Sequence, residues 1–364
     1  MKYTLCVTQR CNLKCQYCYV KKRNAQMPHE VAERIIDFAY RHTPPDEDID
    51  IGFFGGEPLL EFDPIKRITD DIERHPSYDP QRVRINIATN GTIFTDEIAS
   101  FLQKNHISLG ISCDGPAESH DVFRRYPGGR SSLSTVAATI QKAVKTLPLV
   151  LVNAVFHPKT YQFLPKTVEY LSALGARRIY LNPDYSAEWT SFDIAQLQDR
   201  FDEVNNLYIN HYLEQKPIFI SLIDYKIAVI LRGGYQKRER CRMGRGEFAF
   251  TPEGNIYPCE RLIGNGDDGD HCIGHIDKGV KLDKMLCHTV LGKEINIECE
   301  TCGLRDYCMN WCGCSNYMST GFYNRASPFT CASEKMLIQC AFRAFNVLEE
   351  KLGPTFYGHL NCQD

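Results

Sequence analysis

The segment that decides the fold reads CNLKCQYCY, from Cys11 to Tyr19, and it begins two residues after the apolar run KYTLCVT of residues 2–8. Its three cysteines are spaced C-x3-C-x2-C. Three thiolates cannot close the tetrahedral shell of a structural zinc ion, which takes four ligands. They can hold three irons of a [4Fe–4S] cube and leave the fourth iron open for a small molecule. We therefore predict an iron–sulfur site at Cys11, Cys15 and Cys18.

The composition is that of an ordinary globular chain with unusually many cysteines. The net charge is 42 − 45 = −3, which gives no general reason to expect a nucleic-acid partner. No apolar run approaches the roughly 20 residues of a membrane span, and the first twenty residues form no signal-peptide apolar region. An odd number of cysteines, 17, without an export signal favours metal ligation in the cytoplasm over disulfides.

Up to about residue 182, short β-rich runs alternate with helical stretches. The expected strands are 2–8, 49–54, 83–89, 107–112, 149–156 and 177–182. The expected helices are 28–42, 61–74, 95–105, 133–146 and 160–174. Repeated βα units predict a parallel sheet, as an open doubly wound sheet or a partial barrel.

Unusual residues directly follow four of these strands, at 11–18, 55–58, 90–91 and 114–115. Active sites of both architectures lie at the carboxyl ends of parallel strands. We therefore expect these four loops to converge on one face of the molecule.

The remaining half of the chain divides in composition at Cys241. The segment 192–232 is helical in pattern and then β-like, which suggests a bridge to a second module. Twelve of the cysteines fall in the last 124 residues, and 332–352 has the pattern of a closing amphipathic helix. We divide the chain into 1–190, the bridging region 191–240, and 241–364.

The C-x3-C-x2-C motif after a first strand, with the aromatic Tyr17 before its last cysteine, resembles the radical SAM superfamily. In that family the open iron is chelated by S-adenosylmethionine (SAM). One electron then cleaves the sulfonium and gives a 5′-deoxyadenosyl radical, which abstracts hydrogen from a substrate. The resemblance implies a partial (β/α)6 TIM-like barrel and an electron donor such as flavodoxin or ferredoxin.

A second motif, GGEP, matches the family's loop for the methionyl amino group. Glycines let the backbone approach closely, and a glutamate can accept a hydrogen bond from an ammonium. An ordinary Gly-Pro loop is the alternative. The resemblance assigns cofactor binding to Gly55, Gly56, Glu57 and Pro58.

Two further loops, ATNG at 88–91 and SCDGP at 112–116, resemble those that meet the ribose and the methionine in the peptide-modifying branch. The resemblance places Asn90 and Ser112 at the cofactor and lets Arg124 reach its carboxylate. Ser112 could instead cap a strand end, and Arg124 could be a surface arginine.

The spacing of the later cysteines fits the SPASM domain that follows many radical SAM barrels. The pattern is Cys-x12-Gly-x4-Cys, then Cys-x2-Cys-x5-Cys-x3-Cys, then a last cysteine after eighteen residues. A pair of zinc knuckles is the alternative, because C-x2-C is also a zinc spacing. The resemblance implies small β-hairpins, a C-terminal helix and two auxiliary clusters, hence three [4Fe–4S] clusters in all. One auxiliary cluster would take Cys299, Cys302, Cys308 and Cys331, and the other Cys241, Cys259 and Cys312.

The second of these sets has only three cysteines, because Tyr235 stands where fully ligated relatives carry a fourth. We hypothesise that its open iron binds a substrate cysteine thiolate. Alternatively Cys272 or Cys287 could fold back as the fourth ligand, and Cys314 could take the place of Cys312.

SPASM proteins modify peptides or proteins, so the resemblance implies a maturase that installs a thioether or other crosslink in a ribosomally made peptide. The alternative is an anaerobic sulfatase maturase, which oxidises serine or cysteine to formylglycine. In those enzymes an aspartate base follows the second SPASM cysteine, and here Glu260 stands there, as a base or in a salt bridge. A non-catalytic zinc or iron–sulfur protein is the rival of another class. The chain begins at strand one, so we expect any leader-binding domain to be a separate protein.

Overall fold

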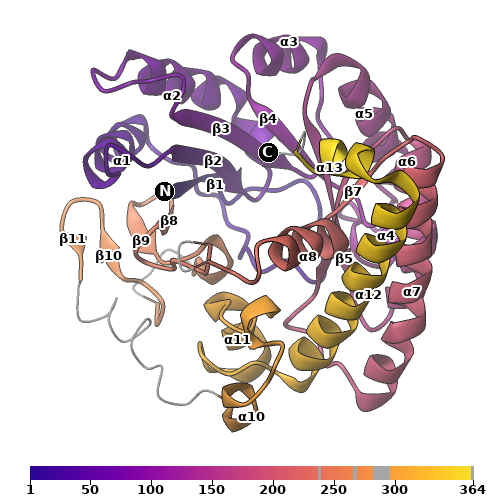
Figure 1. Ribbon diagram of the computed structural model, residues 1–364. Helices are drawn as coiled ribbons and strands as arrows, with labels where there is room; N and C mark the ends of the chain where they lie inside the picture. The colour runs from indigo at the N-terminus through magenta and orange to yellow at the C-terminus, as the bar shows by residue number, and fades with distance from the viewer. Residues whose placement is uncertain (237–238, 265–268, 282–295, 362–364) are drawn as a thin grey trace.

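The computed structural model describes residues 1–236, 239–264, 269–281 and 296–361 (Figure 1). Its centre is a curved parallel sheet whose strands are connected by helices on the outer side. The strands are β1 (Lys2–Thr8), β2 (Ile49–Gly55), β3 (Val83–Thr89), β4 (Ser108–Ser112), β5 (Val150–Phe156), β6 (Arg178–Pro183) and β7 (Phe219–Ile220). The outer helices are α1 (His29–His42), α2 (Phe62–Arg74), α3 (Asp96–Lys104), α4 (Ala117–Phe123), α5 (Leu133–Thr146) and α6 (Leu164–Ala173).

The six predicted strands and five predicted helices of this half are confirmed, most within one residue at each end. The predicted helix 160–174 divides into a 3-10 turn, Tyr161–Phe163, and α6. The sequence did not predict α4, a helix of only seven residues. Neighbouring strands pair in parallel from β1 through β7, which confirms the barrel-like α/β class.

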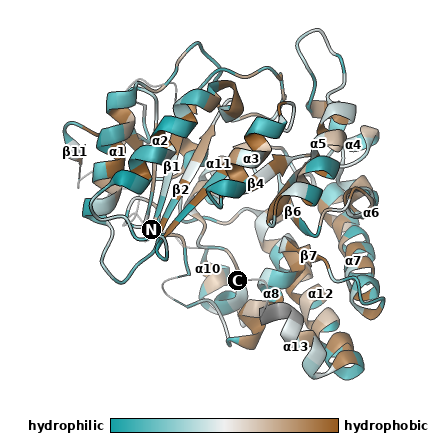
Figure 2. Ribbon diagram, turned by 90° about the horizontal axis from the view of Figure 1, so that it is seen from above, coloured by the Kyte–Doolittle hydropathy of each residue, from teal (hydrophilic) through white to brown (hydrophobic). Residues whose placement is uncertain are grey.

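The two faces of the sheet differ sharply in polarity. Ile, Leu, Val and Phe side chains of alternate positions pack against the helices in one continuous core. Figure 2 shows the matching brown, apolar sides of the helices. The opposite, inner face carries polar side chains, and Asn86 Nδ2 donates to Asp50 Oδ1 across it at 2.6 Å. Other polar residues at these inner positions are Lys2, Thr4, Ser108, Ser112, Asn153, Tyr180 and Asn182.

The inner face of an ordinary (β/α)8 barrel is filled by branched apolar side chains. Here glycines on the inner face let neighbouring polar side chains lie close to the backbone. A Cβ at Gly52 would lie 3.1 Å from Asn86 Oδ1, and a Cβ at Gly110 would lie 3.2 Å from Asn153 Nδ2. The barrel interior thus carries many polar side chains, which suit a polar ligand, together with a few apolar ones such as Phe54, Leu151 and Val155.

Two small hairpins follow, β8 (Glu247–Phe250) with β9 (Asn255–Tyr257) and β10 (Gly274–His275) with β11 (Gly279–Val280). They confirm the hairpins expected near the C-terminal cysteines. Strand β8 pairs in parallel with β1, so one sheet runs β11-β10-β9-β8-β1-β2-β3-β4-β5-β6-β7. The sheet thus crosses the boundary proposed at residue 241, and that division of the chain remains a prediction.

Helices α7 (Ser191–Leu213), α8 (Ser221–Leu231) and α12 (Pro328–Leu352) pack together at one side (Figure 1). The predicted closing helix is confirmed, with its start moved to Pro328 by the Ser327 side chain, which caps Thr330 N at 3.1 Å. The β-like interpretation of the end of 192–232 is wrong, because only Phe219–Ile220 is a strand. Asp224 accepts from Ile220 N at 2.6 Å and stabilises the start of α8, whose apolar run then packs on α12. Among the described residues the structure also has the α-helices α10 (Ile297–Glu300), α11 (Gly313–Thr320) and α13 (Pro354–Asn361).

A search of the described residues for helices long and apolar enough to span a bilayer finds none.

A buried ion pair joins α8 to α12. Lys226 Nζ lies 2.5 Å from Glu334 Oε2, and the two side chains are only 6% and 8% exposed. Lys226 also donates to the carbonyl of Tyr307 at 3.0 Å, and Met309 N donates to the same Glu334 carboxylate. Each buried charge is neutralised by the other, so removing one partner leaves an unpaired charge that is shielded from water.

Lys226→Met is expected to destabilise the protein by about 3 to 5 kcal/mol, since Glu334 is then left buried and unpaired. Adding Glu334→Gln removes the second charge and keeps an acceptor for Met309 N, so the double variant should recover most of the loss. The measurement is the urea midpoint of unfolding for both variants. A double variant no more stable than Lys226→Met would contradict this account.

Candidate functional site

The cysteine loop lies at the carboxyl end of β1 and is held at both ends. Met27 N donates to Val7 O at 2.8 Å, and Gln9 N donates to Ala25 O at 2.9 Å, so the loop closes on its own strand. At its centre Lys14 N donates to Arg125 O at 2.8 Å. These backbone contacts hold a loop that carries three thiols in a fixed place against α4.

The GGEP loop packs directly on this segment. Gly56 N donates to Thr8 O and Glu57 N donates to Arg10 O, both at 2.8 Å. A Cβ at Gly55 would lie 2.0 Å from Thr8 O, and one at Gly56 2.1 Å from Arg10 O. Gly55 also has a φ of +139°, which disfavours any other residue. The two glycines are therefore required for this close backbone contact.

Glu57 is fully buried and its carboxylate is already engaged. Oε1 accepts from Leu59 N at 3.0 Å and from Thr89 Oγ1 at 2.7 Å, and Oε2 accepts from Asn90 N at 2.6 Å. Burial raises the pKa of Glu57 above its usual value, although these hydrogen bonds favour the ionised form. The side chain thus ties the loop after β2 to the loop after β3, a structural role that the sequence did not reveal.

Asn90 connects the third of these loops to the first. Its Nδ2 donates to Asn12 Oδ1 at 2.8 Å and lies 3.7 Å from Cys11 Sγ. Its Oδ1 accepts from Thr92 N at 2.9 Å. The loops after β2 and β3 therefore meet the cysteine loop close to Cys11, as predicted.

On the other side of the cysteine loop, the Tyr17 hydroxyl lies between a buried carboxylate and a buried guanidinium. Its hydroxyl donates to Asp114 Oδ2 at 2.6 Å and accepts from Arg124 Nη1 at 2.8 Å. Burial raises the pKa of both Tyr17 and Asp114. Burial opposes the charge of Arg124, but Tyr17, Cys15 and Asp114 outweigh it and raise its pKa. Asp114 belongs to the SCDGP segment, but the sequence pattern predicted no role for it.

Arg124 is a buried residue and not the surface arginine of the alternative interpretation, since only 6% of it is exposed. Within the part of the chain that the structure describes, its Nε is buried without a hydrogen-bond partner. A buried guanidinium with a donor to spare fits an anionic group such as a carboxylate. Ser112 ends β4 two residues before Asp114, near this charged group.

The four cysteines predicted for one auxiliary cluster line a single cavity. It is enclosed by the segment 299–310 and by the first part of α12, and its cysteines are Cys299, Cys302, Cys308 and Cys331. Residues that are separated by up to 32 positions in the sequence thus come together. Four thiols around one cavity are the donor set of a [4Fe–4S] cluster.

The three cysteines predicted for the other auxiliary cluster, Cys241, Cys259 and Cys312, also fall in one group of packed side chains. Cys272, a candidate for its fourth ligand, belongs to a different buried group, with Cys6 as a neighbour. The other candidate, Cys287, lies outside the described residues.

No three His, Cys, Asp or Glu side chains of the described residues are grouped closely enough to hold a single metal ion.

Glu260 lies on the inner face beside the start of β1, and its carboxylate interacts electrostatically with Tyr19 of the cysteine loop. Its Oε2 accepts from Lys2 Nζ at 2.9 Å and from Thr4 Oγ1 at 3.1 Å. Burial opposes ionisation, but the Lys2 ammonium outweighs it and holds the pKa of Glu260 below its usual range. The salt-bridge interpretation is therefore present in the structure, and a role as base stays a prediction.

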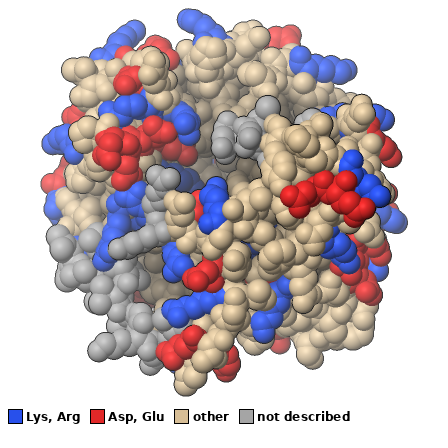
Figure 3. Space-filling model, viewed as in Figure 1, with Lys and Arg blue, Asp and Glu red and all other residues tan. Residues whose placement is uncertain are grey.

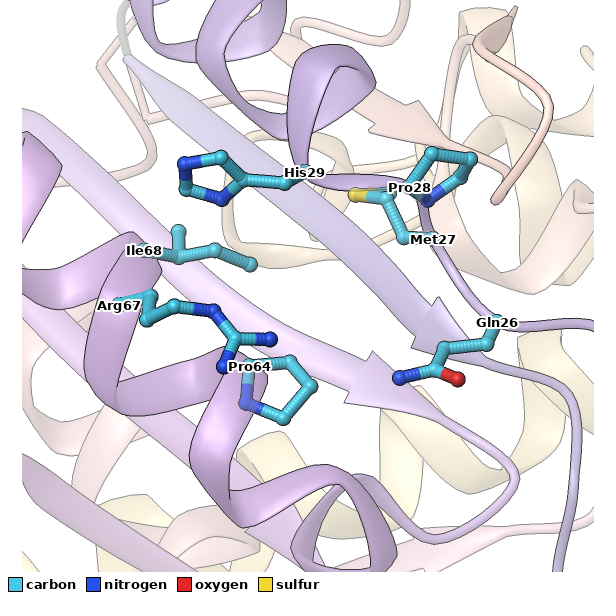
Figure 4. Close-up of a pocket in the computed structure, with 7 residues that line it drawn as sticks. All are labelled: Gln26, Met27, Pro28, His29, Pro64, Arg67 and Ile68. Atoms are coloured by element: carbon cyan, nitrogen blue, oxygen red, sulfur yellow. The ribbon is translucent and has the colours of Figure 1, made fainter.

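A separate cavity of about 270 Å³ lies outside the barrel, between the starts of α1 and α2 (Figure 4). Gln26, His29 and Arg67 line it together with apolar side chains, and it contains none of the predicted site residues. The face in Figure 3 is hollowed near its centre, and acidic and basic side chains are mixed across it.

Comparison with known proteins agrees with this geometry. The family model described as the radical SAM superfamily matches residues 5–185. An uncharacterized protein of Methanocaldococcus jannaschii is 31% identical over 80% of this chain and 95% of its own length. A cysteine-type anaerobic sulfatase-maturating enzyme of Clostridium perfringens is 28% identical over 70% of this chain and 72% of that enzyme.

Solved structures share the fold across nearly the whole chain. The anSMEcpe structure with bound AdoMet and Cp18Cys peptide has a TM-score of 0.79 at 20% identity, covering 96% of this chain and 98% of that one. SuiB of Streptococcus suis, bound to the precursor peptide SuiA, has a TM-score of 0.61 at 17% identity, covering 90% and 75%. With its three-cysteine loop at the end of the first strand of this shared fold, the chain is an enzyme of the radical SAM superfamily.

Proposed function

We propose that this enzyme is a peptide maturase, which abstracts a hydrogen atom from a ribosomally made peptide and installs a thioether or another crosslink. The observation that carries the proposal is the polar inner face of the barrel, next to the loops of Cys11, Glu57 and Arg124. A peptide backbone needs many hydrogen-bonding partners when it leaves water, and an apolar barrel core would offer none. The peptide-bound relatives of the same fold, anSMEcpe and SuiB, support a peptide substrate.

The residues of the cysteine loop fit the group that the family uses. Cys11, Cys15 and Cys18 would hold the cluster, and SAM bound to it would supply the 5′-deoxyadenosyl radical. Arg124 would hold the cofactor carboxylate with its Nε, and Ser112, at the carboxyl end of β4, would contact the cofactor. Asn90 would face the nucleoside, and Tyr17 would fix the guanidinium of Arg124.

The GGEP loop would bind the methionyl ammonium through its backbone. Because the Glu57 carboxylate accepts three hydrogen bonds from its own chain, its contribution would be to position Gly55, Gly56 and Pro58 and the loop of Asn90. Two auxiliary clusters would occupy the C-terminal cysteine groups, which gives three clusters in total.

Formylglycine formation is the second candidate, and the 28% identity to the cysteine-type anaerobic sulfatase-maturating enzyme of Clostridium perfringens supports it. That reaction needs a base for the substrate serine or cysteine, and Glu260 is the residue proposed for it. Its ion pair with Lys2 keeps the carboxylate ionised at neutral pH, as a base must be, and at the same time makes it a weaker proton acceptor. For this reason we place crosslink formation first.

We further propose the cytoplasm as the compartment, a flavodoxin or ferredoxin as electron donor, and a separate leader-binding protein as a possible partner. A reducing compartment keeps clustered thiols available for iron.

Replacing Cys11, Cys15 and Cys18 together by alanine is expected to abolish reductive cleavage of SAM and to leave the iron of the auxiliary clusters in place. The reason is that these three cysteines lie on a loop of the barrel, separate from the C-terminal cysteines proposed to hold the auxiliary clusters. The measurement is 5′-deoxyadenosine release and iron content. Cys113→Ala is the matched control, because Cys113 follows β4 and is buried in the apolar core. It should change neither SAM cleavage nor iron content. Full SAM cleavage by the triple variant would refute the assignment.

Glu57→Gln is expected to lower both the thermal stability of the protein and its affinity for SAM. The amide nitrogen would face an N–H or O–H donor, and an unsatisfied buried group costs about 1 to 3 kcal/mol. Unfolding temperature and the SAM dissociation constant are measured together, with the exposed Glu97→Gln as control. A normal unfolding temperature with weak SAM binding would instead indicate direct contact with the cofactor, and no change in either would leave Glu57 without the proposed role.

If Glu260 is a catalytic base, Lys2→Met should shift the acid limb of the pH–rate profile to higher pH. Lys2 lowers the pKa of Glu260, so its removal raises that pKa, and the carboxylate is then protonated at a higher pH than before. Product formation is followed against pH with Cys- and Ser-containing peptides. Glu247→Gln, which alters the other acid beside Lys2, is the control. An unmoved acid limb in Lys2→Met would mean that Glu260 serves only in the salt bridge.

A further inference from the structure

The auxiliary cysteine group around Cys259 contains one more thiol than the sequence pattern assigned to it. Cys314 packs in the same group as Cys241, Cys259 and Cys312, and only 5% of it is exposed. Cys314 Sγ lies 3.7 Å from Cys312 Sγ. The group is thus made of four cysteines, closed by two apolar neighbours, Met243 and Leu262.

The local backbone explains why two cysteines with a single residue between them reach the same group. Cys312 is the N-cap of α11 and has an extended conformation, with φ −74° and ψ 99°. Gly313 and Cys314 begin the helix, so the chain turns sharply between the two cysteines. A Cβ at Gly313 would lie 2.9 Å from the Met243 methyl carbon, so a side chain there would displace this neighbour. The glycine lets the turn pack against Met243, and the turn carries both cysteines.

Two other candidates for the fourth position, Tyr235 and Cys272, are engaged elsewhere, and the third, Cys287, lies outside the described residues. The Tyr235 ring packs edge-on against Trp311 at 5.0 Å, and its backbone N donates to Asp306 O at 2.8 Å. Lys226, beside the other cysteine group, lies over the same ring at 5.3 Å. Cys272 donates to Gly274 O at 3.2 Å within its own buried group.

A charged neighbour also suits a cluster at this position. The Arg261 guanidinium interacts electrostatically with both Cys312 and Cys314, and it lies 5.7 Å from the centre of the Tyr185 ring. Thiolates bound to iron would carry negative charge into this buried group, and a nearby guanidinium offsets it.

We propose that Cys314 is the fourth ligand of the auxiliary cluster that Cys241, Cys259 and Cys312 begin. This inference rests on the proposed auxiliary cluster and names its ligand set. Each cysteine binds one iron as thiolate and releases its proton to solvent. The cluster is then closed, so it has no free iron for a substrate thiolate, in contrast to the open site considered from the sequence. It serves as an electron-transfer centre, and a substrate cysteine reacts without binding to it.

The test uses the full chain in the Cys11, Cys15 and Cys18→Ala background, so that only auxiliary iron is observed. Iron and sulfide content, electron paramagnetic resonance and the reduction potential are measured for Cys314→Ala and Cys314→Ser. Cys340→Ala is the matched control, because Cys340 is also buried but its thiol donates to Asp202 Oδ1 on α7 at 3.4 Å. Cys272→Ala and Cys287→Ala test the competing ligands.

Cys314→Ala is expected to lose one cluster or to convert it to a three-iron form, while the cluster of Cys299 is retained. Cys314→Ser should keep the cluster and shift its potential and spectrum, because an alkoxide replaces the thiolate. Added 2-mercaptoethanol or a cysteine-containing peptide should change the spectrum of Cys314→Ala and leave that of the background protein unchanged.

Four results would separate the possible failures. Spectra of Cys314→Ala and Cys314→Ser identical to the background would overturn the inference, and cluster loss in Cys272→Ala or Cys287→Ala alone would name another ligand. A response of the background protein to added thiol would show an open iron and also overturn it. A background protein with iron for one cluster only would instead refute the proposed auxiliary cluster itself.

Discussion

The close backbone contact between the GGEP loop and the end of β1 is the constraint on which the rest of the site depends. Gly55 and Gly56 approach the carbonyls of Thr8 and Arg10 at distances that exclude any side chain. From this contact Glu57 turns inward and binds the loop of Asn90, which in turn reaches Cys11. The position of the cysteine loop thus depends on contacts at the ends of three successive strands, β1, β2 and β3. A side chain at Gly55 or Gly56 would displace the loops at all three strand ends.

Much of the barrel could be predicted from the sequence, because alternating apolar runs and helical periodicity are local properties. The strands from β1 to β6 and the motif loops after them appeared where the pattern placed them. The short helix α4 and the two-residue β7 were not recognisable, since elements of this length carry too little periodicity. Helix α8 was misread because its run of Ile, Val and Leu favours a strand locally, and packing on α12 decided the outcome.

Some features of the candidate site could likewise be predicted from the sequence, and others could not. Residue types and spacing identified the cysteines, the glycines and Arg124, which are recognised by the chemistry that they share with a family. The partners of these residues were not predictable, since they depend on contacts between distant segments. The Tyr17 hydrogen bond to Asp114 joins residues 97 positions apart, and the Lys2 ammonium reaches Glu260 over 258. Burial and pairing, which decide what a carboxylate or an arginine does, became visible only in the folded chain.

The order of the strands has a topological consequence for what bounds the barrel interior. In the described part of the chain the sheet is a linear series from β11 to β7, with two edges and no pairing between them. A closed ring pairs every strand on both sides, whereas among these described residues β7 and β11 each pair on one side only. Helix α8 packs beside β6 and β7 at one of these edges. The inner face is therefore bounded there by a helix and not by a further strand.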